Sequence, residues 1–247
     1  MNLLARVVAL CAAAVLVSTA QAGGGDLLRQ AIETEKNLRS KTSIFERKPN
    51  YEAAIDLYSR ALAAGNLSRS QRETALFNRA ALRVEQGECK DAVADLSELL
   101  RSQPKNGSAY AARGSCLRAL GELDSALEDF TRAVSLLPKD PMLRAERGEI
   151  YAAKKDYGAA ISDYDASLQR LRPGESGDLY VARGDAYAAQ ANYEKAIEDY
   201  RSAIRVKREN AKRLLDSQDP SSELAPIYSK LGDAYHALAK RAGKGRN

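Results

Sequence analysis

Residues 148–164 are GEIYAAKKDYGAAISDY, and residues 184–200 are GDAYAAQANYEKAIEDY. The two stretches start 36 residues apart, and each has a glycine first, an alanine twelve residues later and a tyrosine four residues after that. Small and apolar residues spaced by three and four positions lie on one face of an α-helix. Each stretch therefore predicts two short helices that are joined by a turn and meet at their small residues.

The same pattern extends along the chain in both directions. Its alanine recurs at separations of 38, 34, 34 and 36 residues, as Ala54, Ala92, Ala126, Ala160 and Ala196. An apolar or aromatic residue follows four positions later: Tyr58, Leu96, Phe130, Tyr164 and Tyr200. A small residue precedes the last four alanines by twelve positions: Ala80, Gly114, Gly148 and Gly184. Pro104, Pro138 and Pro173 end three of the units, because proline cannot continue a helix.

A helix-turn-helix unit of 34 residues with small residues at positions 8 and 20 resembles the tetratricopeptide repeat family. Placing each aligned alanine at position 20 gives units 35–68, 73–106, 107–140, 141–174 and 177–210, followed by a capping helix at about 222–241. The resemblance implies an all-α fold, a right-handed superhelical solenoid of stacked helix-turn-helix repeats. Position 8 of the first unit is Thr42, so an earlier start of its leading helix, near Asp26, stays open.

The first 22 residues have the pattern of a secretory signal peptide. A basic start is followed by the apolar run Val7 to Val17, eleven residues long, and by Ala20-Gln21-Ala22. A bilayer span needs about 20 residues, so a retained membrane anchor is the weaker alternative. We expect cleavage after Ala22 and a periplasmic or secreted protein of residues 23–247.

Export affects the interpretation of the two cysteines that remain, Cys89 and Cys116. They are 27 residues apart and belong to no CxxC or zinc-type pattern. An oxidising compartment permits a disulfide between them. The alternative, two buried free thiols, stays open.

Two charged positions recur in the repeats. Arginine occupies position 7 as Arg79, Arg113, Arg147 and Arg183, and aspartate occupies position 23 as Asp95, Asp129, Asp163 and Asp199. Both positions neighbour core positions on facing helices. We expect repeated, bidentate arginine–carboxylate pairs that stabilise the hairpins rather than an acid/base or anion site.

The resemblance also implies a binding groove on the inner wall that the first helices form. The groove residues singled out by it are Phe77, Val84, Glu85, Arg118, Glu149, Asp178, Val181, Asp185 and Asp233. Most other wall positions are small, so the groove is able to seat a helix or an extended peptide. Its acidic members favour a basic or neutral ligand, and we expect Asp178 and Asp185 to face solvent. A merely solvated helix face is the alternative.

Positive charge collects near the C-terminus, in a chain of formal net charge +5. Its members are Arg201, Arg205, Lys207, Arg208, Lys212 and Arg213, then Lys240, Arg241, Lys244 and Arg246. In an exported protein the expected counterpart is an anionic membrane or cell-wall polymer, with a soluble face as the alternative. No nucleic-acid-binding motif accompanies these residues, so we predict no nucleic-acid partner.

The sequence lacks a recognisable catalytic arrangement. His236 is the only histidine, and no GxSxG, HExxH or P-loop spacing occurs. We predict a non-enzymatic protein-protein interaction scaffold of the bacterial cell envelope, with no cofactor, metal or small-molecule substrate, that binds a protein or peptide partner in its groove. The alternative function is an envelope adaptor that contacts anionic membrane or cell-wall polymer through the basic C-terminal surface.

Overall fold

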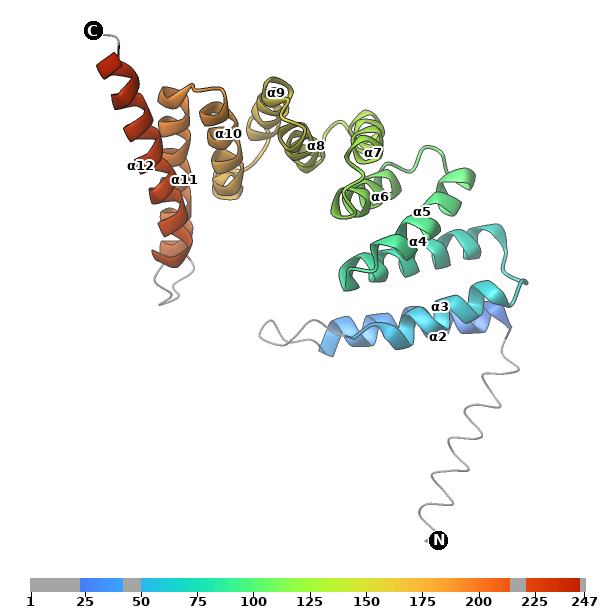
Figure 1. Cartoon of the computed structure of the whole chain (residues 1–247). Coiled ribbons are helices and arrows are strands. Elements are labelled where there is room, and N and C mark those ends of the chain that lie inside the picture. Colours follow the sequence, from blue (N-terminus) through green and yellow to red (C-terminus); the bar gives the residue numbers. More distant parts are fainter. Residues whose placement is uncertain (1–22, 42–49, 214–220, 245–247) are drawn as a thin grey trace. The chain divides into compact units, whose positions relative to one another are not determined.

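The computed structural model describes residues 23–41, 50–213 and 221–244, and all regular structure in these ranges is helical (Figure 1). The helices are α2 (Gly24–Lys41), α3 (Glu52–Ala63), α4 (Arg69–Gln86), α5 (Cys89–Ser102), α6 (Gly107–Ala119), α7 (Leu123–Leu136), α8 (Pro141–Ala153), α9 (Tyr157–Leu168), α10 (Gly177–Ala189), α11 (Tyr193–Arg213) and α12 (Ser221–Lys244). A short 3-10 turn, η1 (Pro173–Glu175), precedes α10. The fold is an all-α helical repeat solenoid, as the sequence period predicts. The predicted signal peptide, residues 1–22, lies outside the described residues.

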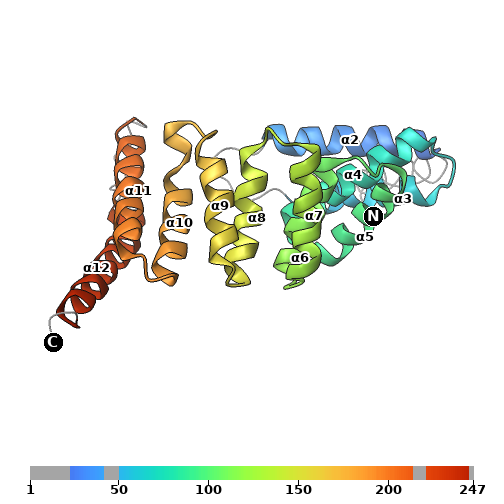
Figure 2. The ribbon, with the colours of Figure 1, turned by 90° about the horizontal axis from the view of Figure 1, so that it is seen from above.

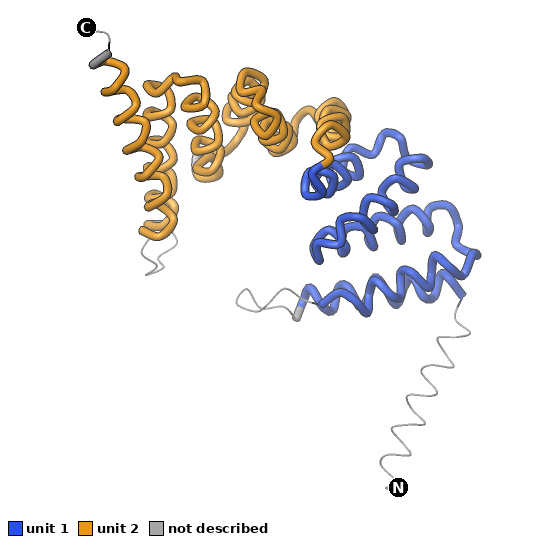
Figure 3. The backbone as a smooth tube through the Cα atoms, viewed as in Figure 1, with its two compact units in different colours: residues 1–121 blue, residues 122–247 orange. Residues whose placement is uncertain are grey.

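The chain divides into two compact units, residues 1–121 and 122–247 (Figure 3). Within the first unit, each helix from α2 to α6 packs against the next one along the chain. Within the second unit, the same holds from α7 to α12, and α8 to α11 lie in a row (Figure 2). Both units are therefore stacks in which sequence neighbours are also spatial neighbours.

Caps and turns explain where the helices begin and end. The Ser68 side chain accepts from the backbone of Gln71 in a capping box, and Asn106 Oδ1 accepts from Ala109 N at 2.9 Å. The turns inside the hairpins use the left-handed backbone region. The residues at these turns are Gly87 (φ 83°), Gly121 (φ 83°), Lys155 (φ 63°) and Ala191 (φ 58°). Glycine adopts this region freely, whereas lysine and alanine do so at a cost.

The small-residue positions lie where helices touch. All five aligned alanines are fully buried. A Cβ atom on Gly148 would lie 2.6 Å from Tyr164 Cε1, and one on Gly184 would lie 2.8 Å from Tyr200 Cε1. Because no real Cβ contact is that short, only glycine lets the two helices approach this closely.

Three of the four predicted arginine–aspartate pairs form inside their own hairpins. Arg147 donates from Nε and Nη2 to the two carboxylate oxygens of Asp163, both at 2.7 Å. Arg79 pairs in the same bidentate way with Asp95, and Arg183 with Asp199. Burial raises the pKa of Asp199, while the hydrogen bonds from Arg183 lower it. Arg113 and Asp129 belong to different compact units, so the fourth pair stays a prediction.

The first hairpin differs from the predicted register. Helix α2 begins at Gly24, so the unit boundary expected at residue 35 falls inside a helix, and the earlier start near Asp26 is the better description. Ala31 is fully buried in one cluster with Ala54 and Tyr58, and it supplies the small residue that position 8 requires. Thr42 lies outside the described residues. Ten residues separate α2 from α3, whereas the other hairpins have two or three there, so the fixed distance of 19 positions from Ala54 back to the start of its unit misplaces that start.

Both cysteine thiols are free, although they lie next to each other between α5 and α6. Cys116 is fully buried and Cys89 is half-buried. Burial, followed by the hydrogen bond with the Cys89 thiol, raises the pKa of Cys116 to about 12. The two thiols are thus neighbours without being bonded.

Candidate functional site

The first unit carries a cleft of about 470 Å³ at one edge of its first helices, which we call the first cleft. Helix α4 supplies Ser70, Glu73, Thr74, Phe77 and Asn78, α5 and its end supply Leu99 and Gln103, and the start of α6 supplies Asn106 and Ser108. Phe77 is half-buried against the core cluster that contains Leu99. The first cleft therefore combines an apolar floor with hydroxyl and amide groups, as ligand pockets commonly do.

Hydrogen bonds across helices hold the walls of the first cleft. Gln103 Nε2 donates to Glu73 Oε2 at 2.7 Å, and Asn106 Nδ2 donates to Gln103 Oε1 at 2.8 Å. The bond from Gln103, followed by the bond from Arg69, lowers the pKa of Glu73. This network joins α4, α5 and the start of α6, so the cleft is pre-formed.

The back of the first cleft connects to a polar relay between α2, α3 and α4. Asn78 Nδ2 donates to the Tyr58 hydroxyl at 3.0 Å, and that hydroxyl donates to Glu35 Oε2 at 2.8 Å. Burial, more than the bond to Glu35, raises the pKa of Tyr58. The relay fixes the side-chain orientation of Asn78.

The second unit carries an equivalent cleft of about 490 Å³, which we call the second cleft. Its lining residues come from α8, the connection through η1, α10 and α11: Pro141, Met142, Leu171, Gly174, Glu175, Gly177, Asp178, Lys207 and Asn210. Lys207 Nζ lies 2.7 Å from Asp178 Oδ1, and Asn210 Nδ2 donates to the Gly174 carbonyl at 2.6 Å. Met142 is 51% exposed at this edge.

The two clefts occupy corresponding places in the repeat. Thr74 and Ser108 line the first cleft, Met142 and Asp178 line the second, and successive members are 34, 34 and 36 residues apart. All four stand at position 2 of their units. Position 31 contributes to both clefts as well, as Gln103 and Lys207. Each of the two compact units therefore has a cleft that is built from the same repeat positions.

Of the predicted groove residues, Phe77 lines the first cleft and Asp178 lines the second. Glu85, at the end of α4, accepts from Arg39 of α2 at 2.6 Å. Val181 packs partly buried against the core between α10, α11 and α12. Val84 and Arg118 are half-buried, and Glu149 and Asp233 are exposed. These six lie outside the described clefts.

Asp185 does not face solvent freely, contrary to the sequence-based expectation. It is half-buried, accepts from the Tyr200 hydroxyl at 2.9 Å and pairs with Lys230 of α12. Asp178 does face solvent, with 91% of its side chain exposed, yet it is paired with Lys207. Each of the two carboxylates thus already has a lysine of the same chain beside it, which weakens the expected preference for a basic ligand.

Sequence reasoning missed the cleft residues outside the first helices, above all Gln103, Asn106 and Lys207. The predicted wall used positions of the first helices alone, whereas the clefts also use the ends of the second helices. The one available signal was Asn106, a helix-capping residue type directly before α6.

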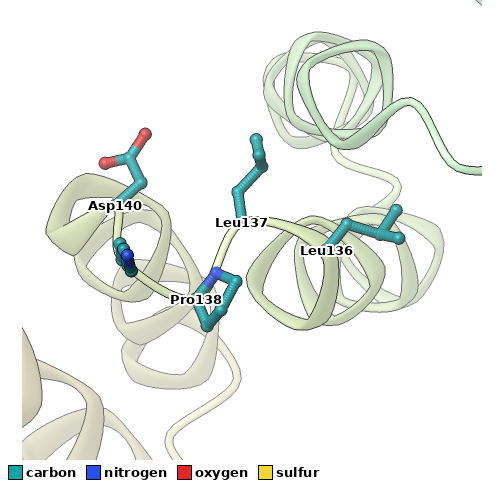
Figure 4. A pocket seen from close by; sticks show the side chains of 5 residues that line it. Leu136, Leu137, Pro138 and Asp140 are labelled. Atoms are coloured by element: carbon teal, nitrogen blue, oxygen red, sulfur yellow. The ribbon is translucent and has the colours of Figure 1, made fainter.

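A third hollow, of about 360 Å³, lies along the connection between α7 and α8. Its lining residues are Leu136, Leu137, Pro138, Lys139 and Asp140. Figure 4 shows Leu137 and Asp140 projecting to the same side of this connection. One continuous segment, from the last residue of α7 to the residue before α8, supplies these lining residues.

The basic C-terminal residues differ in their exposure and in the side chains that they contact. Arg201, Arg205 and Arg208 are exposed along α11, and the guanidinium groups of Arg201 and Arg208 lie 5.5 and 5.8 Å from the ring centres of Tyr235 and Tyr228 of α12. Lys207 contacts Asp178 and Glu223. The side chains of Arg213 and Lys244, and all of Arg246, lie outside the described part of the chain.

Among the described residues, no helix is long and apolar enough to cross a membrane. The same ranges contain no cluster of His, Cys, Asp and Glu side chains suited to a metal ion.

Stacked helical hairpins with clefts at the edge of their first helices define a helical-repeat protein. Family models of the tetratricopeptide repeat match residues 77–141, 124–176 and 177–210. The chain belongs to the tetratricopeptide repeat family, whose members bind protein or peptide partners and are typically non-enzymatic.

Solved structures share this fold. A crystal structure of MamA protein aligns with a TM-score of 0.65 at 20% identity, over 79% of this chain and 100% of that one. MamA from Desulfovibrio magneticus RS-1, from residue 41 to its end, aligns with a TM-score of 0.54 at 20% identity, over 71% and 96%. YrrB, described as a TPR protein with an unusual peptide-binding site, aligns with a TM-score of 0.56 at 28% identity, over 66% and 83%. No curated protein sequence matches the chain.

Proposed function

We propose that this protein is a non-enzymatic scaffold of the bacterial cell envelope that binds a peptide or helix of a partner protein in the first cleft. The observation that carries the proposal is the pre-formed hollow around Phe77, at the family's inner-wall positions. The description of YrrB as a peptide-binding TPR protein supports the same role for a cleft on this fold.

The chemistry of the first cleft favours an apolar side chain flanked by peptide backbone. Its volume of about 470 Å³ has the size of a pocket for a small ligand or a few side chains. Phe77, packed against the core cluster of the buried Leu99, offers apolar surface, while Asn78 and Ser108 offer groups that hydrogen-bond a peptide. The one carboxylate, Glu73, already accepts from Gln103 and Arg69, so a neutral segment fits better than a strongly basic one.

The cleft is tested with a partner captured by crosslinking from envelope proteins, identified by mass spectrometry and then purified. Ser108→Phe fills the cleft from an exposed position, and Phe77→Ala removes its aromatic floor. Each should raise the Kd at least tenfold, which is about 1.4 kcal/mol. The matched control is Ser135→Phe, at an exposed serine on α7.

Circular dichroism must show an unchanged helix content for each variant. The proposal is wrong if Ser108→Phe and Ser135→Phe bind the partner equally well.

The envelope location rests on the N-terminal sequence. Expression with fractionation of the cells should place the protein outside the cytoplasm, and sequencing should give Gly23 as its first residue. A protein that stays in the cytoplasm and keeps Met1 would overturn this part of the proposal and leave the cleft untouched.

One observation favours the adaptor as a second candidate. Arg201, Arg205 and Arg208 are exposed at i, i+4 and i+7 along α11, so their charges follow one helix face. In that case the protein should bind vesicles containing anionic lipid, and binding should fall steeply from low to moderate salt. Arg205→Glu with Arg208→Glu should abolish this binding, whereas Ser108→Phe should not alter it.

A further inference from the structure

Helix α12 has the register of the first helix of a sixth repeat, and no other helix in the described part of the chain covers one of its faces. Its buried residues Leu224, Ile227 and Ala234 pack toward α11. Positions 4, 8, 11 and 15 of the repeat fall on Tyr228, Gly232, Tyr235 and Ala239, about 100° around the helix from those residues. Tyr228 is 42% exposed, Tyr235 is 40% exposed, and no described side chain or other helix comes within 4 Å of a Cβ built on Gly232.

The complete hairpins of the second unit show what covers this face in a finished repeat. There, the ring of Tyr164 lies directly against Gly148, and the ring of Tyr200 lies against Gly184. Both rings come from an antiparallel second helix of the same hairpin. Gly232 is the equivalent of Gly148 and Gly184, so it offers a vacant place for a tyrosine ring from an antiparallel helix.

The uncovered face carries such rings itself. Along α12 it alternates large and small residues, Tyr228, Gly232, Tyr235 and Ala239, with spacings of four, three and four. Reversing the helix direction leaves these spacings unchanged and exchanges each tyrosine with a small residue. An antiparallel copy therefore sets Tyr235 against Gly232 and Tyr228 against Ala239, which is the self-complementarity that a two-fold interface requires.

The rings are also held in place before any partner arrives. Arg208 lies over Tyr228 and Arg201 over Tyr235, each at less than 6 Å from the ring centre. We propose that α12 pairs antiparallel with α12 of a second copy of this chain, so that each helix covers the uncovered face of the other.

The test measures the mass of the purified full chain in solution by sedimentation equilibrium. The wild-type chain should form a dimer of two 26.8 kDa chains. Gly232→Tyr sets two tyrosines against each other, and Tyr235→Gly removes the ring that fills the glycine. Each single substitution should weaken dimerisation at least tenfold.

The combined variant, Gly232→Tyr with Tyr235→Gly, is the decisive control, because it exchanges the large and small positions and restores the match. It should dimerise again, which a heterologous contact elsewhere on the chain would not reproduce. Circular dichroism should show the same helix content in all four proteins, since Gly232 has open space and Tyr235 is exposed.

Three results would overturn the proposal. If the wild-type chain stays monomeric at about 1 mM, the uncovered face of α12 does not pair with a second copy, and its partner is another protein. A dimer that survives both single substitutions lies elsewhere, and a combined variant that stays monomeric rules out the antiparallel register. None of these results bears on the first cleft, which belongs to the other compact unit.

Discussion

Position 8 of the repeat shows how one residue type serves opposite purposes. At Gly148 and Gly184 the missing side chain makes room for a tyrosine ring of the facing helix. At Gly232 the same position meets no atom within 4 Å outside its own helix and chain neighbours. The energetic consequence of adding a single methyl group should therefore change sign between these sites.

Gly148→Ala should destabilise the protein, although alanine is the better helix former by about 1 kcal/mol. The new Cβ would meet Tyr164 Cε1 at 2.6 Å, and displacing a packed ring costs about 1–3 kcal/mol. Gly232→Ala is the matched control and, at a chain concentration too low for the proposed pairing of two α12 helices, should stabilise α12 by up to about 1 kcal/mol. Urea denaturation followed by circular dichroism measures both. A stabilised Gly148→Ala protein would contradict the close helix contact.

The buried pair of Arg147 and Asp163 should tolerate joint replacement better than single replacement. Arg147→Met leaves the buried carboxylate of Asp163 without its guanidinium partner, which should cost about 3–5 kcal/mol. Arg147→Met combined with Asp163→Leu removes both charges and should cost far less. A double-mutant cycle in urea gives the coupling energy. Equal losses for the single and double variants would show that the pair does not act as a unit.

At the scale of elements, the sequence predicted most of the fold. The period predicted the succession of helical hairpins from α4 to α11 because small residues, prolines and capping residues recur with little change in turn length, although α4 begins four residues before the unit expected at 73 and α11 ends three residues beyond 210. It failed for the first hairpin, since a ten-residue connection between α2 and α3 breaks the count. Ala31 was recognisable as a small residue in a helical stripe only once the true start of α2 was known.

The thiols of Cys89 on α5 and Cys116 on α6 should differ in reactivity. The high pKa of Cys116, caused first by burial, keeps this thiol protonated and unreactive near neutral pH. Cys89, which is half-buried, should therefore be alkylated first by iodoacetamide at pH 8 in the native protein, with Cys116 following only on unfolding. Peptide mass spectrometry locates the labels.

Equal labelling of both cysteines in the native state would contradict that arrangement. Recovery of a Cys89–Cys116 disulfide from the exported protein would instead answer the question that the sequence leaves open. Because the two thiols are neighbours, an oxidising compartment permits that bond to form.

For the whole molecule, the buried tyrosines set an upper limit to the pH range of stability. Burial raises the pKa of Tyr58, Tyr164 and Tyr200 above the ordinary value of 10.0. In the unfolded chain these phenols ionise at about pH 10, so their stabilising contribution is complete below that pH and is lost as the pH rises toward the folded pKa.

Unfolding should therefore begin above about pH 10, and tyrosinate absorbance should rise together with the loss of helical circular dichroism. Tyr164→Phe keeps the ring and removes one ionisable proton, so its alkaline midpoint should lie higher than that of the wild-type chain. Full tyrosinate formation with intact helices would contradict the burial of these hydroxyl groups.

The candidate site was less predictable than the fold. Position counting found Phe77 and Asp178, because both belong to first helices. It missed Gln103 and Lys207, which reach the clefts from second helices. It also placed Asp185 in solvent, since nothing near it in the sequence reveals Lys230, 45 residues away. The residues that line a cleft come from successive hairpins, and the spacing inside one repeat does not reveal them. Helix formation depends on residues within the same hairpin.

The spacing of the buried ion pairs has an evolutionary consequence. Arg79, Arg147 and Arg183 each bind an aspartate 16 residues further along the chain. If unequal recombination deletes or duplicates one whole period, every arginine again meets an aspartate 16 residues away, wherever the crossover falls. The gene for such a protein can therefore gain or lose hairpins without stranding a buried charge.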